Sequence, residues 1–266
     1  MIRQLENVFA LDTKHTSYCF QVLPGGHLEH LYYGKRLRIE QASEADVLKE
    51  KRAFPAGNTI SYCAESPELS LEDIRLEMSS YGKGDIREPF VEIEYDDGSV
   101  TSDFLYTDMQ MLQKKQALDT LPSSYEEDGA VQDLTVVLKE KKYGLTLELH
   151  YSVFEDRDVI VRSAKLVNTG TAAVKLLRLM SLQLDYETCG YVMSTFNGSW
   201  AREMYRHDTR IEAGKFVNAS YAGTSSNRAN PFVMLSRPET TEDYGACYGF
   251  NLIYSGNHYE AVEVNS

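Results

Sequence analysis

Short runs of alternating apolar and polar residues, separated by turn residues, constrain the fold of this chain more than any other feature. The clearest run spans residues 145–153, in which every second side chain is apolar. A period of two places these apolar side chains on one face of a β-strand. No segment between residues 85 and 266 combines sustained helical periodicity with capping residues at both ends. We therefore predict an all-β sandwich with little helix.

Turn residues indicate where the strands are joined. The Pro-Gly-Gly sequence at 24–26 predicts one hairpin, and the Asp-Gly pair within residues 96–99 predicts another, between strands at 90–95 and 100–106. Asp-Gly favours such a turn because glycine adopts positive φ at little cost. Further turns between strands are predicted at residues 141–144, 155–158 and 168–170.

Residues 34–80 are less regular, and they are rich in charged residues, proline, serine and glycine. We predict a long excursion with little strand of its own. Loops of this length in compact domains are often functional. Apolar residues within the segment favour a binding or interface role, and these are Phe54, Ile60, Tyr62, Leu69 and Leu71.

Composition bounds the class of protein. A chain of 266 residues with 42% hydrophobic residues can bury a substantial core, and no internal boundary is evident, so we expect residues 1–266 to form a single domain. The net charge of −13 argues against nucleic acid and anionic membrane surfaces as partners. The N-terminus has no basic region followed by an apolar run, and no apolar stretch approaches the ~18 residues that span a bilayer. We expect a cytoplasmic protein.

Cysteine and histidine are placed unfavourably for a metal site. The cysteines are far apart without a C-x-x-C pair, and the six histidines show no metal-ligand spacing. We expect reduced thiols, no metal and no cofactor. The cysteines are Cys19, Cys63, Cys189 and Cys247.

No set of catalytic residues is evident. The adjacent carboxylates at 96–97, 126–128 and 155–156 all fall in predicted turns, where solvent keeps carboxyl groups near their ordinary acidity. The chain also lacks a G-x-S-x-G elbow, a phosphate-binding loop and a dinucleotide fingerprint. We therefore predict no catalytic residue within this sequence.

Trp200 is the first candidate for ligand binding. It is the only tryptophan, and it lies beside Arg202 and Glu203 in a glycine-containing loop. An indole ring can stack against the C–H face of a sugar while charged neighbours bind its hydroxyl groups. A large core side chain is an equally reasonable interpretation.

Asp85 and Arg87 are weaker candidates. They follow two glycines, and their spacing places both on one face of a strand that would start there. A local ion pair that fixes the loop is the favoured interpretation, with binding of a polar ligand as the alternative.

Eight short motifs occur in the same order as in one enzyme family. They are Tyr33-Gly34, Arg52-Ala-Phe54, Leu69-Ser-Leu71, Tyr81-Gly-Lys-Gly-Asp-Ile-Arg87, Val161-Arg-Ser-Ala164, Ser199-Trp-Ala-Arg-Glu203, Ser225-Ser-x-x-x-Asn-Pro-Phe232 and Tyr248-Gly-Phe-x-Leu-Ile-Tyr-Ser-Gly-Asn257. Each motif is weak alone, and their common order makes the match specific. Over essentially its whole length the chain resembles the N-terminal domain of bacterial and fungal α-galactosidases of glycoside hydrolase family 36.

The resemblance implies a large β-supersandwich of two packed, mainly antiparallel sheets. It also implies that a C-terminal (β/α)8 barrel outside this sequence carries two catalytic aspartates and hydrolyses terminal α-galactosides, of melibiose or raffinose type, with retention. In that family the enzymes form tetramers in which loops of this domain approach a neighbouring active site. A free-standing sandwich that binds carbohydrate, or serves assembly without enzymatic activity, is the alternative.

The resemblance also bears on individual residues. Trp200 falls on the motif whose tryptophan contacts the galactose pocket in the family, which favours the sugar-binding interpretation. Relatives have a substrate-contacting aspartate immediately before Arg-Ala-Phe, whereas this chain has Lys51. Lys51 is therefore a weak substrate-binding candidate, and a shared substrate preference does not follow from that position.

Overall fold

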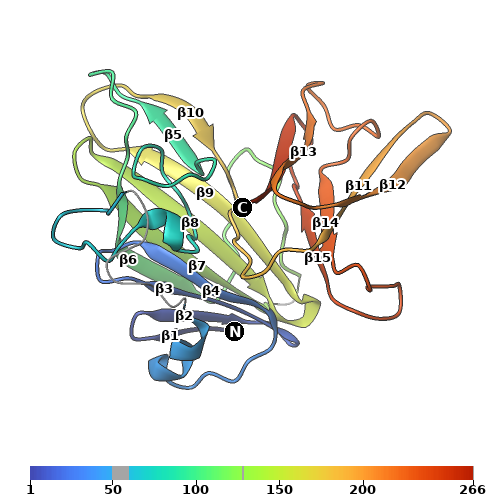
Figure 1. Cartoon of the computed structure of the whole chain (residues 1–266), viewed down its shortest axis with the longest axis horizontal. Coiled ribbons are helices and arrows are strands. Elements are labelled where there is room, and N and C mark those ends of the chain that lie inside the picture. The colour runs from blue at the N-terminus through green and yellow to red at the C-terminus, as the bar shows by residue number, and fades with distance from the viewer. Residues whose placement is uncertain (50–59, 128, 266) are drawn as a thin grey trace. The chain divides into compact units, whose positions relative to one another are not determined.

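The computed structural model describes residues 1–49, 60–127 and 129–265 (Figure 1). This part of the chain forms sixteen β-strands and three short 3-10 helices, and every pair of strands in its sheets is antiparallel. The prediction of an all-β, mainly antiparallel fold with little helix is confirmed. Within these residues no helix has the length and apolar character needed to cross a membrane.

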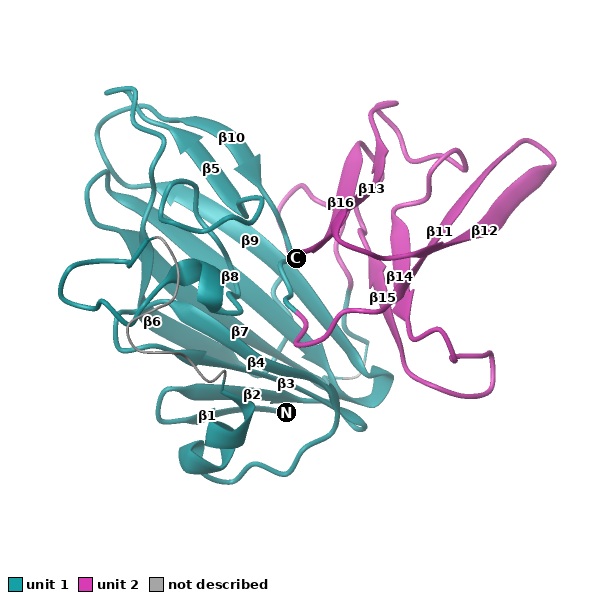
Figure 2. Ribbon diagram, viewed as in Figure 1, with its two compact units in different colours: residues 1–116, 125–185 teal, residues 117–124, 186–266 magenta. Residues whose placement is uncertain are grey.

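The chain divides into two compact units (Figure 2). The first unit contains residues 1–116 and 125–185, and the second contains residues 117–124 and 186–266. No feature of the sequence indicated this division, and the expectation of a single domain over residues 1–266 stays a prediction.

Two four-stranded sheets form most of the first unit. The first sheet is a meander of β1 (Ile2–Leu5), β2 (Val8–Asp12), β3 (Thr16–Val22) and β4 (Leu28–Lys35). The second is a meander of β6 (Phe104–Leu112), β7 (Val131–Glu140), β8 (Leu145–Phe154) and β9 (Val159–Asn168). The predicted turn at 24–26 joins β3 to β4, with Gly26 at a φ of 93°. The turns predicted at 141–144 and 155–158 join β7 to β8 and β8 to β9.

The two four-stranded sheets of the first unit share one hydrophobic core. Phe9 and Phe20 from the first sheet pack with Leu147 and Tyr151 from the second, and all four side chains are buried. The rings of Phe20 and Tyr151 stack with centroids 5.3 Å apart. Burying each such side chain contributes roughly 1.5–3 kcal/mol, so this contact between sheets is a main source of stability.

The predicted hairpin around residues 96–99 is wrong, although its turn forms. Gly98 donates its N–H to the carbonyl of Tyr95 at 3.0 Å and has a φ of 79°. However, β5 (Val91–Glu94) pairs with β10 (Lys175–Leu179), and β6 begins only at Phe104 and pairs with β7. Val91 and Ile93 are buried in the shared core, so burial of this face decided the pairing instead of proximity in sequence.

The excursion after β4 has little strand, as predicted. Its described residues contain the 3-10 helices η1 (Ala42–Leu48) and η2 (Leu71–Asp73) and a few isolated bridges. A small cluster of Leu23, Leu71, Ile74 and Leu76 is buried, and Tyr62 and Leu69 pack against it. Ile60 is 54% exposed, and Phe54 lies outside the described residues.

The second unit has a four-stranded and a two-stranded sheet. The larger sheet has the order β12 (Arg202–Arg210), β11 (Val192–Ser199), β14 (Phe232–Ser236) and β15 (Cys247–Asn251). The smaller sheet pairs β13 (Gly214–Ser220) with β16 (His258–Val264). Met193, Ile211, Val233 and Leu235 form the buried core of this unit. The last short 3-10 helix, η3 (Glu155–Arg157), belongs to the first unit.

Candidate functional site

Trp200 lies in the turn between β11 and β12, at the end of a hairpin in the second unit. Its side chain is 89% exposed, so the interpretation of Trp200 as a core residue of this chain is wrong. Met204 and Tyr205, which follow on β12, are 55% and 59% exposed. Exposed apolar side chains grouped in this way are typical of a binding surface.

The turn that carries Trp200 has a fixed local geometry. A Cβ at Gly198 would lie 2.3 Å from the carbonyl oxygen of Arg202, so only glycine fits there without movement of the backbone. Ala201 adopts a φ of 60° and donates its N–H to Glu203 Oε1 at 2.8 Å. Arg202 Nε donates to Ser199 Oγ at 2.6 Å. The two charged neighbours of Trp200 therefore hold the turn, and they retain further hydrogen-bonding capacity for a ligand.

The middle of strand β11 in this hairpin is bound to the loop that precedes β14. Asn230 donates to the carbonyl of Phe196 through its backbone N–H at 3.0 Å and through Nδ2 at 2.7 Å. Asn197 Nδ2 donates to the carbonyl of Arg228 at 3.1 Å. The rings of Phe196 and Phe232 are 5.6 Å apart. These contacts give the Ser225–Phe232 motif a structural role that sequence reasoning did not assign to it.

Asp85 and Arg87 form the local ion pair that the sequence favoured. Arg87 Nη1 lies 2.8 Å from Asp85 Oδ1, and Arg87 Nε lies 2.8 Å from Asp185 Oδ2. Arg87 also donates to the carbonyls of Leu71, at 3.2 Å, and Ile74, at 2.6 Å. The pair thus fixes the loop to the segment around η2.

The predicted strand starting at Asp85 is wrong, because β5 begins at Val91. Pro89 has no backbone N–H to donate to a sheet. The guanidinium of Arg87 donates hydrogen bonds to backbone carbonyls of the segment around η2. Burial disfavours the charged form of Arg87, but Asp185 and Asp85 outweigh it and raise the pKa of this residue. Burial raises the pKa of Asp185.

Sequence reasoning missed a buried polar network in the first unit. The Glu77 carboxylate is 0% exposed and accepts hydrogen bonds from Tyr18 at 2.6 Å, Tyr151 at 2.7 Å and His30 Nδ1 at 2.8 Å. Arg162 Nη2 lies 3.2 Å from Glu77 Oε2. Its members come from β3, β4, β8, β9 and a loop, and we call them the Glu77 network. All its groups are committed to one another, which indicates a structural role.

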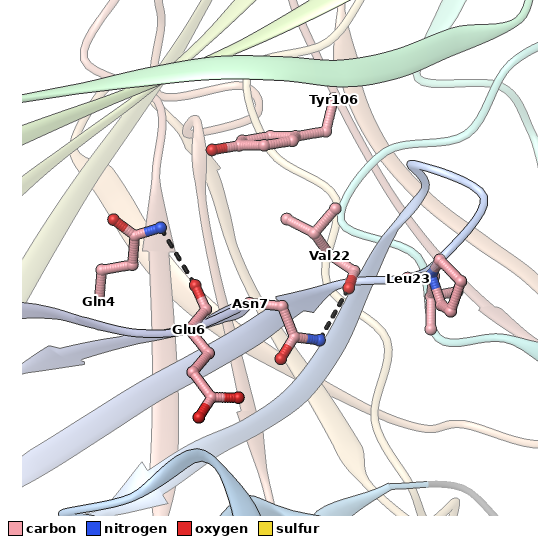
Figure 3. A pocket seen from close by; sticks show the side chains of 7 residues that line it. Gln4, Glu6, Asn7, Val22, Leu23 and Tyr106 are labelled. Atoms are coloured by element: carbon pink, nitrogen blue, oxygen red, sulfur yellow. Dashed lines mark hydrogen bonds between the residues drawn. The ribbon is translucent and has the colours of Figure 1, made fainter.

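A shallow hollow of about 420 Å³ lies beside the β1–β2 turn of the first unit (Figure 3). The ring of Tyr106 lies across this hollow from Gln4, Asn7 and Val22. Gln4 Nε2 donates to the carbonyl of Glu6 at 3.1 Å, and Asn7 Nδ2 donates to that of Val22 at 2.9 Å. Because both amide groups bond to the local backbone, few polar groups are left to orient a ligand in this hollow.

The candidate residues lie in different parts of the chain. Trp200 belongs to the second unit, whereas Asp85 and Arg87 belong to the first, and Lys51 lies outside the described residues. In the part of the chain that the structure describes, no three His, Cys, Asp or Glu side chains are grouped as they would be around a metal ion.

Comparison with known proteins gives one consistent family. The family model described as the glycosyl hydrolase family 36 N-terminal domain matches residues 26–266. The α-galactosidase AgaA from Geobacillus stearothermophilus is 32% identical over 261 residues, which cover 97% of this chain and 35% of that protein. An α-galactosidase from Lactobacillus acidophilus is 35% identical over 257 residues, covering 96% of this chain and 35% of the relative.

Solved structures show the same relationship. The crystal structure of the α-galactosidase from Lactobacillus brevis matches with a TM-score of 0.93 and 36% identity, covering 99% of this chain and 35% of that one. A variant of AgaA in complex with raffinose matches with a TM-score of 0.91 and 30% identity, covering 97% of this chain and 35% of that one. This chain thus spans about a third of the length of these relatives. Because the family match extends over residues 26–266, the chain belongs to the glycosyl hydrolase family 36 N-terminal domain family.

Proposed function

We propose that this chain is the N-terminal, non-catalytic part of a retaining α-galactosidase that acts on terminal α-galactosides of melibiose or raffinose type. In this proposal Trp200 forms a wall of the substrate pocket, and a catalytic barrel outside the sequence carries out the hydrolysis. The chain also takes part in assembly of a homo-oligomer, a tetramer by resemblance, in the cytoplasm. The α-galactosidases among its relatives, one of them in complex with raffinose, support the substrate class.

The exposure of Trp200 carries the proposal for the pocket. An 89% exposed indole on a turn held by Gly198, Arg202 and Glu203 is an aromatic surface that this chain does not use for its own core. Such a ring can stack against the apolar face of galactose, and the neighbouring charged groups can bind hydroxyl groups.

Substitution in the full-length enzyme tests the role of Trp200. We expect Trp200→Ala to raise KM for raffinose about two- to twelvefold, because a lost aromatic contact costs about 0.5–1.5 kcal/mol. Trp200→Phe should retain part of the affinity. Tyr244→Ala removes an aromatic ring that is 75% exposed elsewhere in the same unit, and it serves as the matched control with unchanged KM. Equal kinetics for Trp200→Ala and wild type would refute the proposed role.

The assignment of catalysis has its own test. The 266-residue chain should not hydrolyse a chromogenic α-galactoside, whereas the full-length protein should. Turnover by the chain alone at enzymatic rates would contradict the proposal. Sedimentation of the full-length protein tests the oligomer, and a monomer would refute the proposed assembly role.

A free-standing carbohydrate-binding sandwich is the second candidate, since the exposed Trp200 would serve it equally well. The reading frame of the source gene separates the two. A long α/β segment after residue 266 supports the α-galactosidase, and a stop codon supports the free-standing domain. Calorimetry with galactose and raffinose then tests binding, and no heat with either sugar would leave only an assembly role.

A further inference from the structure

Three polar side chains are packed together on the paired strands of the smaller sheet in the second unit. Asn218 on β13 lies directly opposite Glu260 on β16, and His258 is two residues before Glu260. His258 and Asn218 are only 3% and 5% exposed. His258 Nδ1 lies 3.0 Å from Glu260 Oε2, and Asn218 Nδ2 donates to the same oxygen at 2.8 Å. We call Asn218, His258 and Glu260 the polar clasp.

The polar clasp binds two consecutive carbonyl groups of the loop before β14. His258 Nε2 lies 3.0 Å from the carbonyl oxygen of Ala229, and Asn218 Nδ2 donates to that of Asn230 at 2.8 Å. Asn230 in turn holds the hairpin, because it donates twice to the carbonyl of Phe196 in the middle of β11. An unbroken series of hydrogen bonds therefore leads from His258 to the strand that ends at the Trp200 turn.

The hydrogen bonds of His258 specify how many protons the clasp holds. The carbonyl oxygen of Ala229 can only accept, so Nε2 must carry a proton. Nδ1 faces a carboxyl oxygen of Glu260, and a hydrogen bond there also requires a proton between the two atoms. The pair must hold one proton more than a neutral imidazole beside a carboxylate. Burial, which raises the pKa of Glu260, favours keeping that proton in the clasp.

We propose that His258, Glu260 and Asn218 position the Trp200 turn through the loop at residues 228–230, and that this positioning requires the proton shared by His258 and Glu260. Its effect on substrate binding rests on the proposed role of Trp200, whereas the coupling of the clasp to the hairpin does not.

The sign of the pH dependence follows from the contacts. Glu260 lies within ion-pairing distance of His258, and the loop presents the uncharged carbonyl of Ala229. Removal of the shared proton leaves a nitrogen lone pair facing an oxygen atom, which is repulsive. The closed clasp holds one proton more than a neutral imidazole beside a carboxylate, so raising the pH opens it.

Hydrogen exchange measured by mass spectrometry on the 266-residue chain tests the coupling. After correction for the intrinsic pH dependence of exchange, peptides covering residues 225–232 and 192–205 should lose protection by at least roughly tenfold between about pH 5.5 and 8, which is the lower limit expected for one lost hydrogen bond to a charged group. The emission anisotropy of Trp200 should decrease over the same interval, because this residue is the only tryptophan in the sequence. Equal protection at both pH values would overturn the proposal.

A variant and a control sharpen the test. His258→Gln cannot carry the shared proton, so its loop and hairpin peptides should exchange at the same corrected rate at both pH values. His15→Gln alters an exposed histidine–carboxylate pair, with Asp158, in the first unit and should keep the wild-type dependence. If His258→Gln retains the wild-type dependence, the proton lies elsewhere and the proposal is wrong. If that variant does not fold, the wild-type pH profile still decides.

Kinetics of the full-length enzyme separate positioning from stability. The ratio of KM between His258→Gln and wild type should fall from about threefold near pH 5.5, below the effect of removing the ring in Trp200→Ala, toward one near pH 8, and kcat should change less. A ratio independent of pH would contradict the coupling of the clasp to substrate binding. If Trp200→Ala leaves KM unchanged while the exchange profile appears as expected, the proposed function of Trp200 fails and the clasp remains.

Discussion

The Glu77 network gives the sharpest prediction for stability, because its charge is buried completely. Glu77→Gln removes one carboxylate oxygen and replaces it with an N–H₂ group of similar size. That group faces hydroxyls that donate to the carboxylate in the wild type, and it leaves the positive charge of Arg162 without its partner. Arg162 is itself only 6% exposed at its side chain, so water cannot replace the lost carboxylate.

The magnitude follows from this burial. Removing one partner of a buried, hydrogen-bonded ion pair costs about 3–5 kcal/mol. A unit of this size loses roughly 2–4 °C in Tm for each kcal/mol, so Glu77→Gln should lower Tm by about 6–20 °C. The double variant Glu77→Gln with Arg162→Met should lose less unfolding free energy than the two single variants lose in sum. The second substitution removes the charge that the first left unpaired.

Thermal and urea unfolding, each followed by circular dichroism, measure the change in Tm and in the free energy of unfolding. Glu94→Gln is the matched control, since its pair with Lys175 has side chains that are 46% and 69% exposed, and exposed pairs contribute less than about 1 kcal/mol. A loss of stability in Glu77→Gln as small as that in the control would refute the reasoning. It would mean that the network tolerates a neutral side chain at its centre.

The same network should give an acid limit to stability. Burial works to raise the pKa of Glu77, but Arg162 and the hydrogen bonds from His30 and Tyr18 outweigh it, and the pKa lies below the ordinary value of 4.5. A lowered pKa in the folded state means that the contribution is complete above about 4.5 and is lost as the pH falls further. The difference in free energy of unfolding between wild type and Glu77→Gln should therefore become smaller at low pH.

Three further substitutions and reactions have expected outcomes. Gly198→Ala places a methyl group against the carbonyl of Arg202. In NMR spectra it should shift the amide resonances of β11 and β12 and leave those of the first unit unchanged. Unshifted resonances in the hairpin would contradict this. Burial raises the pKa of Cys19 to about 12, so a thiol reagent should modify the exposed Cys189 in the native protein and Cys19 only after unfolding, and early reaction of Cys19 would contradict its burial. Arg87→Lys loses the two hydrogen bonds of the guanidinium to the backbone around η2. It should lower the free energy of unfolding in urea by about 2 kcal/mol, and an unchanged urea midpoint would contradict this.

Local patterns predicted the strands better than they predicted the partners of those strands. The alternation in residues 145–153 identified β8 because each of its apolar side chains faces the shared core. The Asp-Gly turn at 96–99 was identified correctly, but no local signal shows that β5 pairs with β10, about eighty positions later in the chain. That pairing depends on which sheets bury Val91 and Ile93 together, and this is a property of the assembled unit.

The candidate site shows the same limit. Sequence reasoning singled out Trp200 because the residue is unique, yet it could not choose between core and surface until the position of the turn was known. No sequence pattern links the residues of the polar clasp, because Asn218, His258 and Glu260 are ordinary polar residues and Asn218 lies some forty positions before the other two. Only the register of β13 with β16 places Asn218 opposite Glu260 and so brings the three together.

Strand β12 is the last strand of its sheet in the described part of the chain, and all nine of its residues are exposed. A free edge of this kind invites pairing with a strand of another molecule, which leads to aggregation. Charged residues along the strand and the left-handed backbone at Met204, with a φ of 59°, make such pairing unfavourable. Arg206 Nε and Asp208 Oδ1 also form an ion pair at 2.7 Å, so these two side chains bind each other and not a strand of another molecule. Efforts to improve expression of this protein should therefore leave the charges of β12 intact, even where they contribute nothing to its core.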